Sequence, residues 1–152
     1  MTTQFSQSPT EGNLIHTQKL EGVTMLIINN PKRLNGWTME MMNALKEAFS
    51  IAVTDDETKV IVLTGADPYY CAGVNLAAAF RLMHPRKLRN MIIELNQALF
   101  DMFLDFSKPI LVAVNGPAIG ASVTSATLCD GIIASEKATF STPFTADRKS
   151  VV

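Results

Sequence analysis

The sequence predicts an α/β fold with a largely parallel sheet, and three observations support this prediction. Short apolar runs at residues 60–64 and 110–114 are typical of strands that are buried on both faces. Segments with apolar residues every three or four positions separate the strand-like runs, as expected for helices that cover such a sheet. Two strand-to-loop-to-helix junctions, at residues 70–76 and 115–122, both end in small residues with glycine. Alternating strands and helices favour parallel pairing.

The first half of the chain begins with a predicted hairpin. Residues 14–19 and 23–29 are strand-like, and the tight Glu21-Gly22 turn joins them. After a loop at residues 30–36, Thr38 can cap a helix that ends before the acidic residues 55–57. One face of this helix collects its apolar positions, which are Met41, Met42, Leu45, Ala48, Phe49 and Ala52.

The second half is predicted to contain a longer helix that begins at Pro85. Its stripe of Met and Phe residues indicates core packing or a subunit contact, and the alternative is a ligand groove. A helix of small residues begins at Gly120, after the buried strand at residues 110–114. Strands are predicted at residues 131–134 and 138–141.

Length and composition restrict the class of protein. With 152 residues, 47% hydrophobic and 18% charged, the chain is expected to be one globular domain rather than a disordered segment. A net charge of −1 gives no reason to expect a nucleic-acid or membrane partner. No apolar run approaches the ~18 residues that span a bilayer.

Cysteine usage and the N-terminal residues bear on the compartment. Cys71 and Cys129 form no CxxC motif, which favours a reducing environment. Residues 1–12 have no Lys or Arg and no apolar core, so we expect a short disordered lead rather than a signal or transit peptide. The sequence therefore predicts a soluble intracellular protein.

The two glycine-containing junctions carry the main chemical hypothesis. In the first, Gly73 lets the chain turn so that the N–H of Val74 points outward. In the second, Pro117 has no N–H and Gly120 clears space, which leaves the N–H of Ala121 free at a helix start. Two such donors would make an oxyanion hole for an enolate-type or tetrahedral oxygen from a thioester or amide. The alternative is that both loops are only tight turns.

Three stretches of the chain carry a resemblance to a known family. They are PKRLNGWTMEMMNAL, VIVLTGADPYYCAGVNL and KPILVAVNGPAIGASVTSATLCDGIIASEKATFSTPF. Together they resemble the crotonase (enoyl-CoA hydratase/isomerase) superfamily, and the last is closest to its peroxisomal Δ3,Δ2-enoyl-CoA isomerase branch. The likeness covers roughly residues 14–146, so residues 13–146 are interpreted as the N-terminal part of a crotonase-like core.

The resemblance implies a spiral of ββα units, incomplete at the C-terminus, around a thioester of coenzyme A. It implies that Val74 and Ala121 supply the oxyanion donors and that the loops at residues 32–35 and 72–76 hold the nucleotide and pantetheine. It implies no metal and no redox cofactor, because coenzyme A arrives as part of the acyl-CoA substrate. The substrate-binding residues would be Lys32, Leu34, Ala72, Gly73, Asn75, Leu76, Pro117 and Gly120.

The resemblance also implies an assembly and a compartment. Family members form homotrimers or dimers of trimers. A peroxisomal location follows from the isomerase branch, and a mitochondrial location is the alternative.

Departures from the family pattern narrow the expected activity. Thr124 and Phe144 stand where hydratases carry two Glu residues, so hydration is not expected. The isomerase branch places its single acid/base Glu about eight residues beyond the Phe, where this chain has Val152. Asn75 replaces the usual Asp, which keeps hydrogen bonding but loses the charge.

Residues 147–152 do not continue the family pattern. Their sequence, DRKSVV, is what a common sequencing adapter encodes when it is read in frame. We therefore expect these residues to be an assembly artefact and the natural protein to be longer. The remainder would hold the acid/base Glu, the rest of the trimer face and a helical subdomain.

The predicted function is that of an enoyl-CoA isomerase in fatty-acid β-oxidation. It would shift a double bond from the 3- to the 2-position through a dienolate, and this chain alone would be inactive. Two alternatives stay open: another crotonase reaction such as thioester hydrolysis, or a non-catalytic acyl-CoA binder or assembly partner.

Other candidate residues are interpreted as structural. Asp67 and Asp130 are expected to form turns or caps, and Cys71 is expected to be a structural thiol because no His lies near it in sequence. His16 is expected at an edge or on the surface. Ser122 is not expected to be a nucleophile, because Thr124 stands where a nucleophile elbow has Gly.

The cations have two interpretations, as phosphate contacts for coenzyme A or as solvated surface charges. They are Lys32, Arg33, Arg81, Arg86, Lys87 and Arg89.

Overall fold

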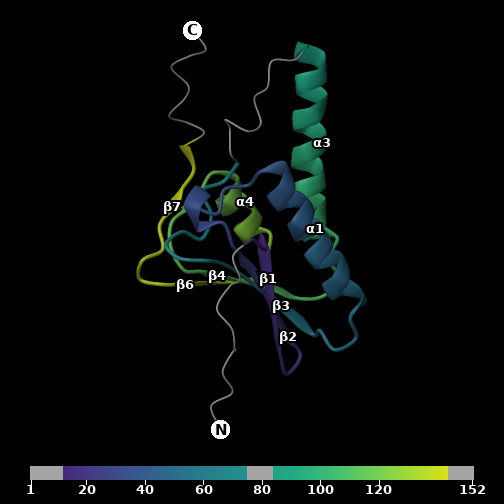
Figure 1. Ribbon diagram of the computed structural model, residues 1–152, viewed down its shortest axis with the longest axis vertical. Coiled ribbons are helices and arrows are strands. Elements are labelled where there is room, and N and C mark those ends of the chain that lie inside the picture. Colours follow the sequence, from purple (N-terminus) through teal and green to yellow (C-terminus); the bar gives the residue numbers. More distant parts are fainter. Residues whose placement is uncertain (1–11, 75–83, 144–152) are drawn as a thin grey trace.

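A five-stranded sheet in the order β1-β2-β3-β4-β6 forms the centre of the protein, with helices packed against it (Figure 1). The structure is a computed structural model that describes residues 12–74 and 84–143. Its strands are β1 (Ile15–Leu20), β2 (Val23–Ile28), β3 (Val60–Gly65), β4 (Ile110–Val114), β5 (Ala118–Ile119), β6 (Gly131–Ala134) and β7 (Phe140–Ser141). Its helices are the 3-10 turn η1 (Pro31–Arg33), α1 (Met39–Thr54), α3 (Pro85–Leu104) and α4 (Ala121–Thr127).

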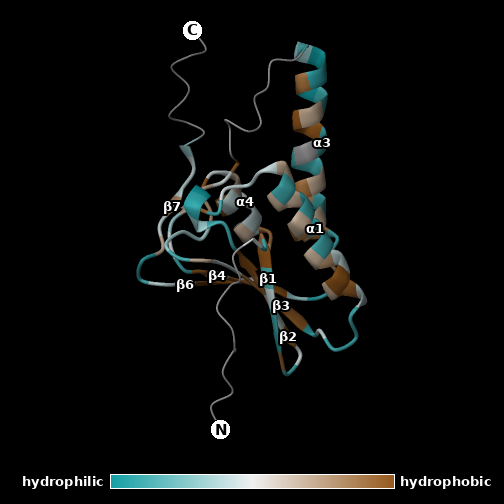
Figure 2. Cartoon of the chain, viewed as in Figure 1, coloured by the Kyte–Doolittle hydropathy of each residue, from teal (hydrophilic) through white to brown (hydrophobic). Residues whose placement is uncertain are grey.

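The pairing confirms the predicted hairpin and the largely parallel sheet. β1 and β2 are antiparallel, and the remaining neighbours in this sheet pair in parallel. Glu21 and Gly22 both have positive φ, which matches the twist of a tight hairpin. Apolar residues line the central strands (Figure 2), and one side of each is fully buried, as at Leu26, Ile61 and Val112. The sheet therefore supplies the core.

α1 begins and packs as its sequence predicts. The Thr38 hydroxyl accepts a hydrogen bond from the Met41 N–H at 3.2 Å and so caps the helix. The residues that this helix buries are Met41, Leu45, Phe49 and Ala52, which all belong to the predicted apolar face. Burying each of the larger side chains contributes about 2 kcal/mol to folding.

α3 packs only part of its length against the body. Leu99 and Phe103 are buried, and Phe49 of α1 meets the Phe103 and Phe106 rings edge-on at 5.4 and 5.0 Å between centroids. Its N-terminal part projects beyond α1 (Figure 1). The Phe103 end of the stripe therefore packs in the core, whereas Met102 and Phe106 line a groove between α1 and α3. Within residues 12–74 and 84–143, no helix has both the length and the apolar character needed to cross a membrane.

A second, two-stranded sheet was not predicted. β5 and β7 pair in parallel, whereas the sequence indicates a loop at residues 115–119 and a longer strand at 138–141. Isolated bridges from Cys71 to Ala118 and from Trp37 to Val74 extend this small layer. Two-residue strands have no periodicity for sequence analysis to detect.

The prediction for His16 is half wrong. It lies on the edge strand β1 as expected, but it is buried, and its Nε2 atom is 3.0 Å from Gln18 Nε2. Consecutive strand residues face opposite sides, so burial of both Ile15 and His16 means that both faces of β1 are covered there.

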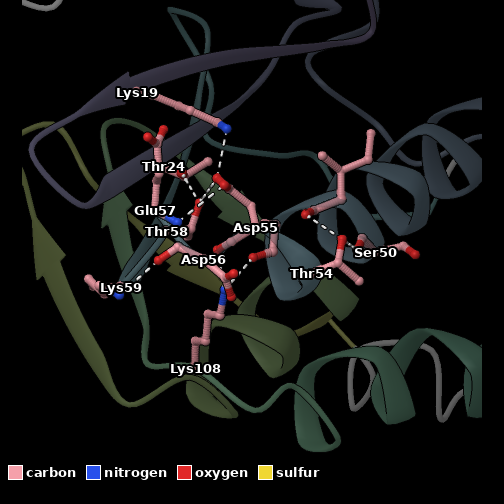
Figure 3. A network of polar contacts seen from close by, with 12 residues as sticks. Lys19, Thr24, Ser50, Thr54, Asp55, Asp56, Glu57, Thr58, Lys59 and Lys108 are labelled. Atoms are coloured by element: carbon pink, nitrogen blue, oxygen red, sulfur yellow. Dashed lines mark hydrogen bonds and ion pairs between the residues drawn. The ribbon is translucent and has the colours of Figure 1, made fainter.

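A polar network joins α1 to the amino ends of β2 and β3 (Figure 3). Asp55 Oδ2 accepts hydrogen bonds from Lys19 Nζ at 2.7 Å and from the Thr58 hydroxyl at 2.6 Å. Thr58 also bonds to Thr24 at 2.7 Å. Lys108 Nζ donates to the carbonyls of Ala52 and Asp55 at the end of α1. These contacts fix the end of the sheet opposite the loops described next.

Candidate functional site

The two predicted loops leave the same edge of the sheet and are hydrogen-bonded to each other. Residues 65–74 follow β3 and residues 115–121 follow β4, and these strands are parallel neighbours. The Cys71 N–H donates to the Pro117 carbonyl at 3.3 Å, and the Ile119 N–H donates to the Cys71 carbonyl at 3.0 Å. The loops therefore form one unit at the carboxyl edge, where ligands bind in many α/β folds.

Glycine allows these backbones to lie this close. A Cβ on Gly73 would lie 2.3 Å from the Ile119 carbonyl oxygen, and one on Gly116 would lie 2.1 Å from the Pro68 carbonyl oxygen. Gly73 also has a φ of +79°, in the left-handed region that glycine favours. Only a residue without a side chain fits at either position.

Val74 directly follows Gly73 at the end of the first loop. The Trp37 N–H donates to the Gly73 carbonyl at 2.8 Å, which holds residues 73 and 74 beside Trp37. Within the described part of the chain, the Val74 N–H has no hydrogen-bond acceptor.

Ala121 holds the corresponding position after Gly120, at the first position of α4. Gly120 has φ 63° and ψ −124°, and its own N–H donates to the Ser141 carbonyl at 2.7 Å. The Gly120 carbonyl accepts from Val123 and Thr124, whereas the Ala121 N–H at the first position of α4 has no acceptor within residues 12–74 and 84–143. The Ala121 nitrogen lies 3.7 Å from where a Gly73 Cβ would be. Among the residues that the structure describes, two donors without an acceptor thus flank the contact between the loops.

Ser122 joins the loops rather than presenting a nucleophile. It is fully buried, and its Oγ accepts from the Ile119 N–H at 2.9 Å. The same Oγ lies 2.9 Å from the Cys71 carbonyl oxygen and 3.0 Å from the Ile119 carbonyl oxygen, so its proton is engaged. This agrees with the sequence-based interpretation.

Asn35 fixes the third loop of the site. It is buried with φ 55°, and its side-chain Oδ1 accepts from the Asn30 N–H at 2.8 Å. Its Nδ2 donates to the carbonyls of Ala66 and Tyr69 at 2.6 and 2.7 Å. Sequence analysis placed Asn35 only within the loop at residues 32–35. The signal that could have found it is an Asn-Gly pair inside a turn, because Asn tolerates positive φ and bonds nearby backbone.

Some predicted substrate-binding residues are brought together. The Ala72 N–H donates to the Leu34 carbonyl at 3.0 Å, so these two adjoin beside Gly73. Pro117 lies on the facing loop, next to Cys71. Lys32 lies exposed on η1. Two others, Asn75 and Leu76, lie outside the described residues, as does Arg81.

The buried groups around the loops are uncharged. Burial raises the pKa of the Cys71 thiol to about 12, and its Sγ accepts from the Gly73 N–H at 3.3 Å, so the thiol stays protonated and structural as predicted. Burial also raises the pKa of Tyr70 well above its ordinary value. The Tyr70 hydroxyl and the Trp37 Nε1 are both buried without a hydrogen-bond partner in the described part of the chain.

Asp130 and Asp67, the two aspartates considered in the sequence analysis, both form structural hydrogen bonds. Asp130 Oδ2 accepts from the Ile110 N–H at 2.8 Å at the start of β4. Asp67 Oδ1 accepts from Asn115 Nδ2 at 3.1 Å, which ties the first loop to the second. Neither is placed to act as a base at residues 73–74 or 120–121.

Comparison with known proteins identifies the family. The sequence pattern of the Enoyl-CoA hydratase/isomerase family matches residues 18–146. The chain is 38% identical to human enoyl-CoA delta isomerase 2 over 128 residues, which is 82% of this chain and 32% of that protein. It is 32% identical to mouse peroxisomal enoyl-CoA delta isomerase 3 over 82% of this chain and 39% of that protein.

A solved structure agrees with these sequence comparisons. The enoyl-CoA hydratase/isomerase of Pseudoalteromonas atlantica superposes with a TM-score of 0.73 at 28% identity, over 87% of this chain and 50% of that one. The chain therefore spans about a third to a half of the length of these relatives. It belongs to the enoyl-CoA hydratase/isomerase (crotonase) family, and the predicted α/β crotonase-like fold is confirmed.

Proposed function

We propose that the N–H groups of Val74 and Ala121 bind the thioester oxygen of a fatty acyl-CoA in an enoyl-CoA isomerase type of site. The observation that supports this most is the pair of acceptor-free N–H groups on two loops held together at Gly73. Backbone donors fixed before the substrate arrives stabilise developing negative charge without reorganising.

The proposed reaction moves a double bond from the 3- to the 2-position in fatty-acid β-oxidation. A carboxylate removes a proton from C2 of the acyl chain and the proton returns at C4, so a dienolate forms between the two steps. The negative charge of the dienolate resides largely on the thioester oxygen, where the two N–H groups donate. Each donor of such a pair typically contributes ~3 kcal/mol to transition-state stabilisation.

The remaining parts of the proposal follow from the family resemblance, apart from the compartment. Leu34, Ala72 and Pro117 border the loop contact and would hold the pantetheine, whereas the exposed Lys32 would meet phosphate. Gly73, Asn75, Leu76 and Gly120 complete the proposed binding set. We propose a homotrimer or dimer of trimers for the full-length protein and, from the peroxisomal relative, a peroxisomal location.

The second candidate function is acyl-CoA binding without turnover, and the residue types favour it for this chain alone. Thr124 and Phe144 stand where hydratases carry carboxylates, and Val152 stands where the isomerase branch carries its Glu. Without a carboxylate at these positions, the oxyanion donors can bind the thioester, but the side chains that remove the C2 proton in the family are missing.

The test is a binding titration of the 152-residue chain with a 3-enoyl-CoA thioester. Trp37 is the only tryptophan in the sequence, and its main-chain N–H donates to the Gly73 carbonyl. Its fluorescence therefore reports on the site. Ala121→Pro removes one donor at a helix position that tolerates proline, and we expect about tenfold weaker binding. Met39→Pro is the matched control, because it makes the same change at the exposed first position of α1.

Three outcomes are decisive. Equal affinity in wild type and Ala121→Pro would overturn the oxyanion assignment. Appearance of the conjugated 2-enoyl thioester with the wild-type chain would support turnover and exclude the binder. Release of free coenzyme A thiol would instead indicate thioester hydrolysis and overturn the isomerase proposal.

A further inference from the structure

The sequence contains two Asn-Gly pairs, and both lie in loops at the carboxyl edge of the sheet. Asn35-Gly36 comes after β2 and η1, and Asn115-Gly116 comes after β4. An asparagine amide converts to a carboxylate most readily before glycine, because glycine has no side chain to hinder attack on the amide and takes conformations that other residues resist. The dipeptides are identical, so a difference in their reactivity must come from the fold.

Hydrogen bonds hold the Asn35-Gly36 pair at each group that this reaction uses. The Asn35 side chain is fully buried, and its Nδ2 donates to the carbonyls of Ala66 and Tyr69 at 2.6 and 2.7 Å. The Gly36 nitrogen is the atom that would attack the amide, and its N–H donates to the Arg33 carbonyl at 2.9 Å. Conversion at Asn35 therefore requires the loop to open first.

The Asn115-Gly116 pair is held less completely. Both glycines are buried, but the Asn115 side chain is half-buried, and the Gly116 N–H has no hydrogen-bond acceptor within residues 12–74 and 84–143. Asn115 Oδ1 accepts from the Gly65 N–H at 3.1 Å, and Asn115 Nδ2 donates to the exposed Asp67 carboxylate at 3.1 Å. A donor on Oδ1 stabilises the negative charge that this oxygen takes up when the amide carbon is attacked. The fold thus leaves the attacking nitrogen without an acceptor and supports the charge of the intermediate.

We propose that Asn115 is a deamidation site of the folded protein and that its conversion weakens the contact between the two loops. The Gly116 nitrogen loses its proton to hydroxide and forms a bond to Asn115 Cγ. The bond from Cγ to Nδ2 then breaks, and the nitrogen takes a proton from water and leaves as ammonia. Water opens the resulting succinimide ring and leaves aspartate or isoaspartate at position 115. The reaction consumes only water.

Either product fits poorly between the loops. Asn115 Nδ2 ties the second loop to Asp67 in the first, whereas a carboxylate would face the Asp67 carboxylate across the same contact and be repelled. Isoaspartate adds a methylene to the main chain next to Gly116, where a Cβ would already lie 2.1 Å from the Pro68 carbonyl oxygen. The loops should therefore separate more easily after conversion. This inference concerns the loops themselves and does not depend on the acyl-CoA assignment.

The experiment follows deamidation of the 152-residue chain at mildly alkaline pH, with and without urea. Digestion at acid pH, where ring closure is slow, and mass spectrometry of the peptides give a rate for each asparagine. In urea, where both pairs are unfolded, the two rates should be similar. In the native chain, we expect Asn115 to convert about tenfold or more faster than Asn35, because only Asn35 waits for the loop to open.

Three results would overturn the deamidation site. They are equal native rates at the two asparagines, faster native conversion at Asn35, and a native Asn115 that stays intact while its unfolded form converts. Asn115→Gln keeps an amide but closes the corresponding ring much more slowly, so it should abolish the mass change in this peptide.

Asn115→Asp tests the effect on the loops, because it introduces one of the two products directly. We expect it to lower the urea midpoint of unfolding relative to wild type. Asn96→Asp makes the same change at an exposed position of α3 and should leave the midpoint unchanged. Circular dichroism checks that each variant folds. Equal midpoints for these two variants would overturn the proposed weakening of the loop contact.

Discussion

The two ends of the parallel sheet are held together by different means. At the carboxyl edge, the loops at residues 65–74 and 115–121 contact each other mainly through backbone, with glycine where a Cβ would clash. At the amino edge, Asp55 gathers Lys19 and Thr58 through side chains (Figure 3). Within residues 12–74 and 84–143, the carboxyl edge leaves polar groups unpaired, whereas the amino edge pairs those of its network.

This contrast indicates a division between binding and stability. Buried polar atoms without partners, which in the described residues are the Tyr70 hydroxyl and the Trp37 Nε1, cost free energy in the fold. Tyr70 lies in the first loop and Trp37 is hydrogen-bonded to that loop, whereas the network at the amino edge pairs its side chains, as Figure 3 shows. The identity of a side chain should therefore matter little at Val74 and Ala121, but the absence of one should matter greatly at Gly73.

The largest expected effect is from Gly73→Ala. Its new Cβ would lie 2.3 Å from a backbone oxygen at a positive φ, and overpacking with strain should lower the free energy of unfolding by about 3 kcal/mol. Gly120→Ala is the control, because it has positive φ but nothing within 4 Å, and it should cost only about 1 kcal/mol. Urea unfolding measures both, and equal losses would show that backbone strain, not crowding, dominates.

A smaller effect of opposite sign is expected from Tyr70→Phe. Removing a buried hydroxyl that lacks a partner should raise the free energy of unfolding by about 1 kcal/mol. The half-buried Tyr69→Phe is the neighbouring control and should be close to neutral. If thermal unfolding shows Tyr70→Phe to be destabilised, then the hydroxyl is satisfied in solution and the contrast between the two edges weakens.

The smallest effect, from Asp55→Asn, concerns pH. Hydrogen bonds from Lys19 and Thr58 lower the pKa of Asp55 from 3.8 to about 2. The stabilisation from the ionised Asp55 carboxylate is therefore present above the pKa of the unfolded state. It is lost as the pH falls through the pKa of the folded state. Between about pH 5 and about pH 2, the midpoint of thermal unfolding should fall less in Asp55→Asn than in wild type.

Asp56→Asn is the control for that comparison, because Lys59 bonds to the main-chain carbonyl of Asp56 rather than to its carboxylate. Parallel pH profiles for wild type and Asp55→Asn would mean that the Asp55 network does not contribute to acid sensitivity.

Local patterns in the sequence predicted much of the fold and located the candidate site. The apolar face of α1 and its Thr38 cap were visible because helical spacing and capping are short-range properties. The small β5–β7 sheet and the burial of His16 were not, because both depend on segments far apart in the chain. The role of Asn35 was missed for the same reason, since its partners Ala66 and Tyr69 belong to another loop.

By itself, the sequence determined the order of strands and helices, the family motifs and the glycines that precede Val74 and Ala121. These follow from periodicity and from the conformations that individual residues allow. The tertiary structure decided that the two glycine loops touch, and that Asn35 bonds to Ala66 and Tyr69 of another loop. Contacts between segments that are far apart in the sequence depend on how the sheet brings those segments together. A local sequence pattern does not specify which distant segments will meet.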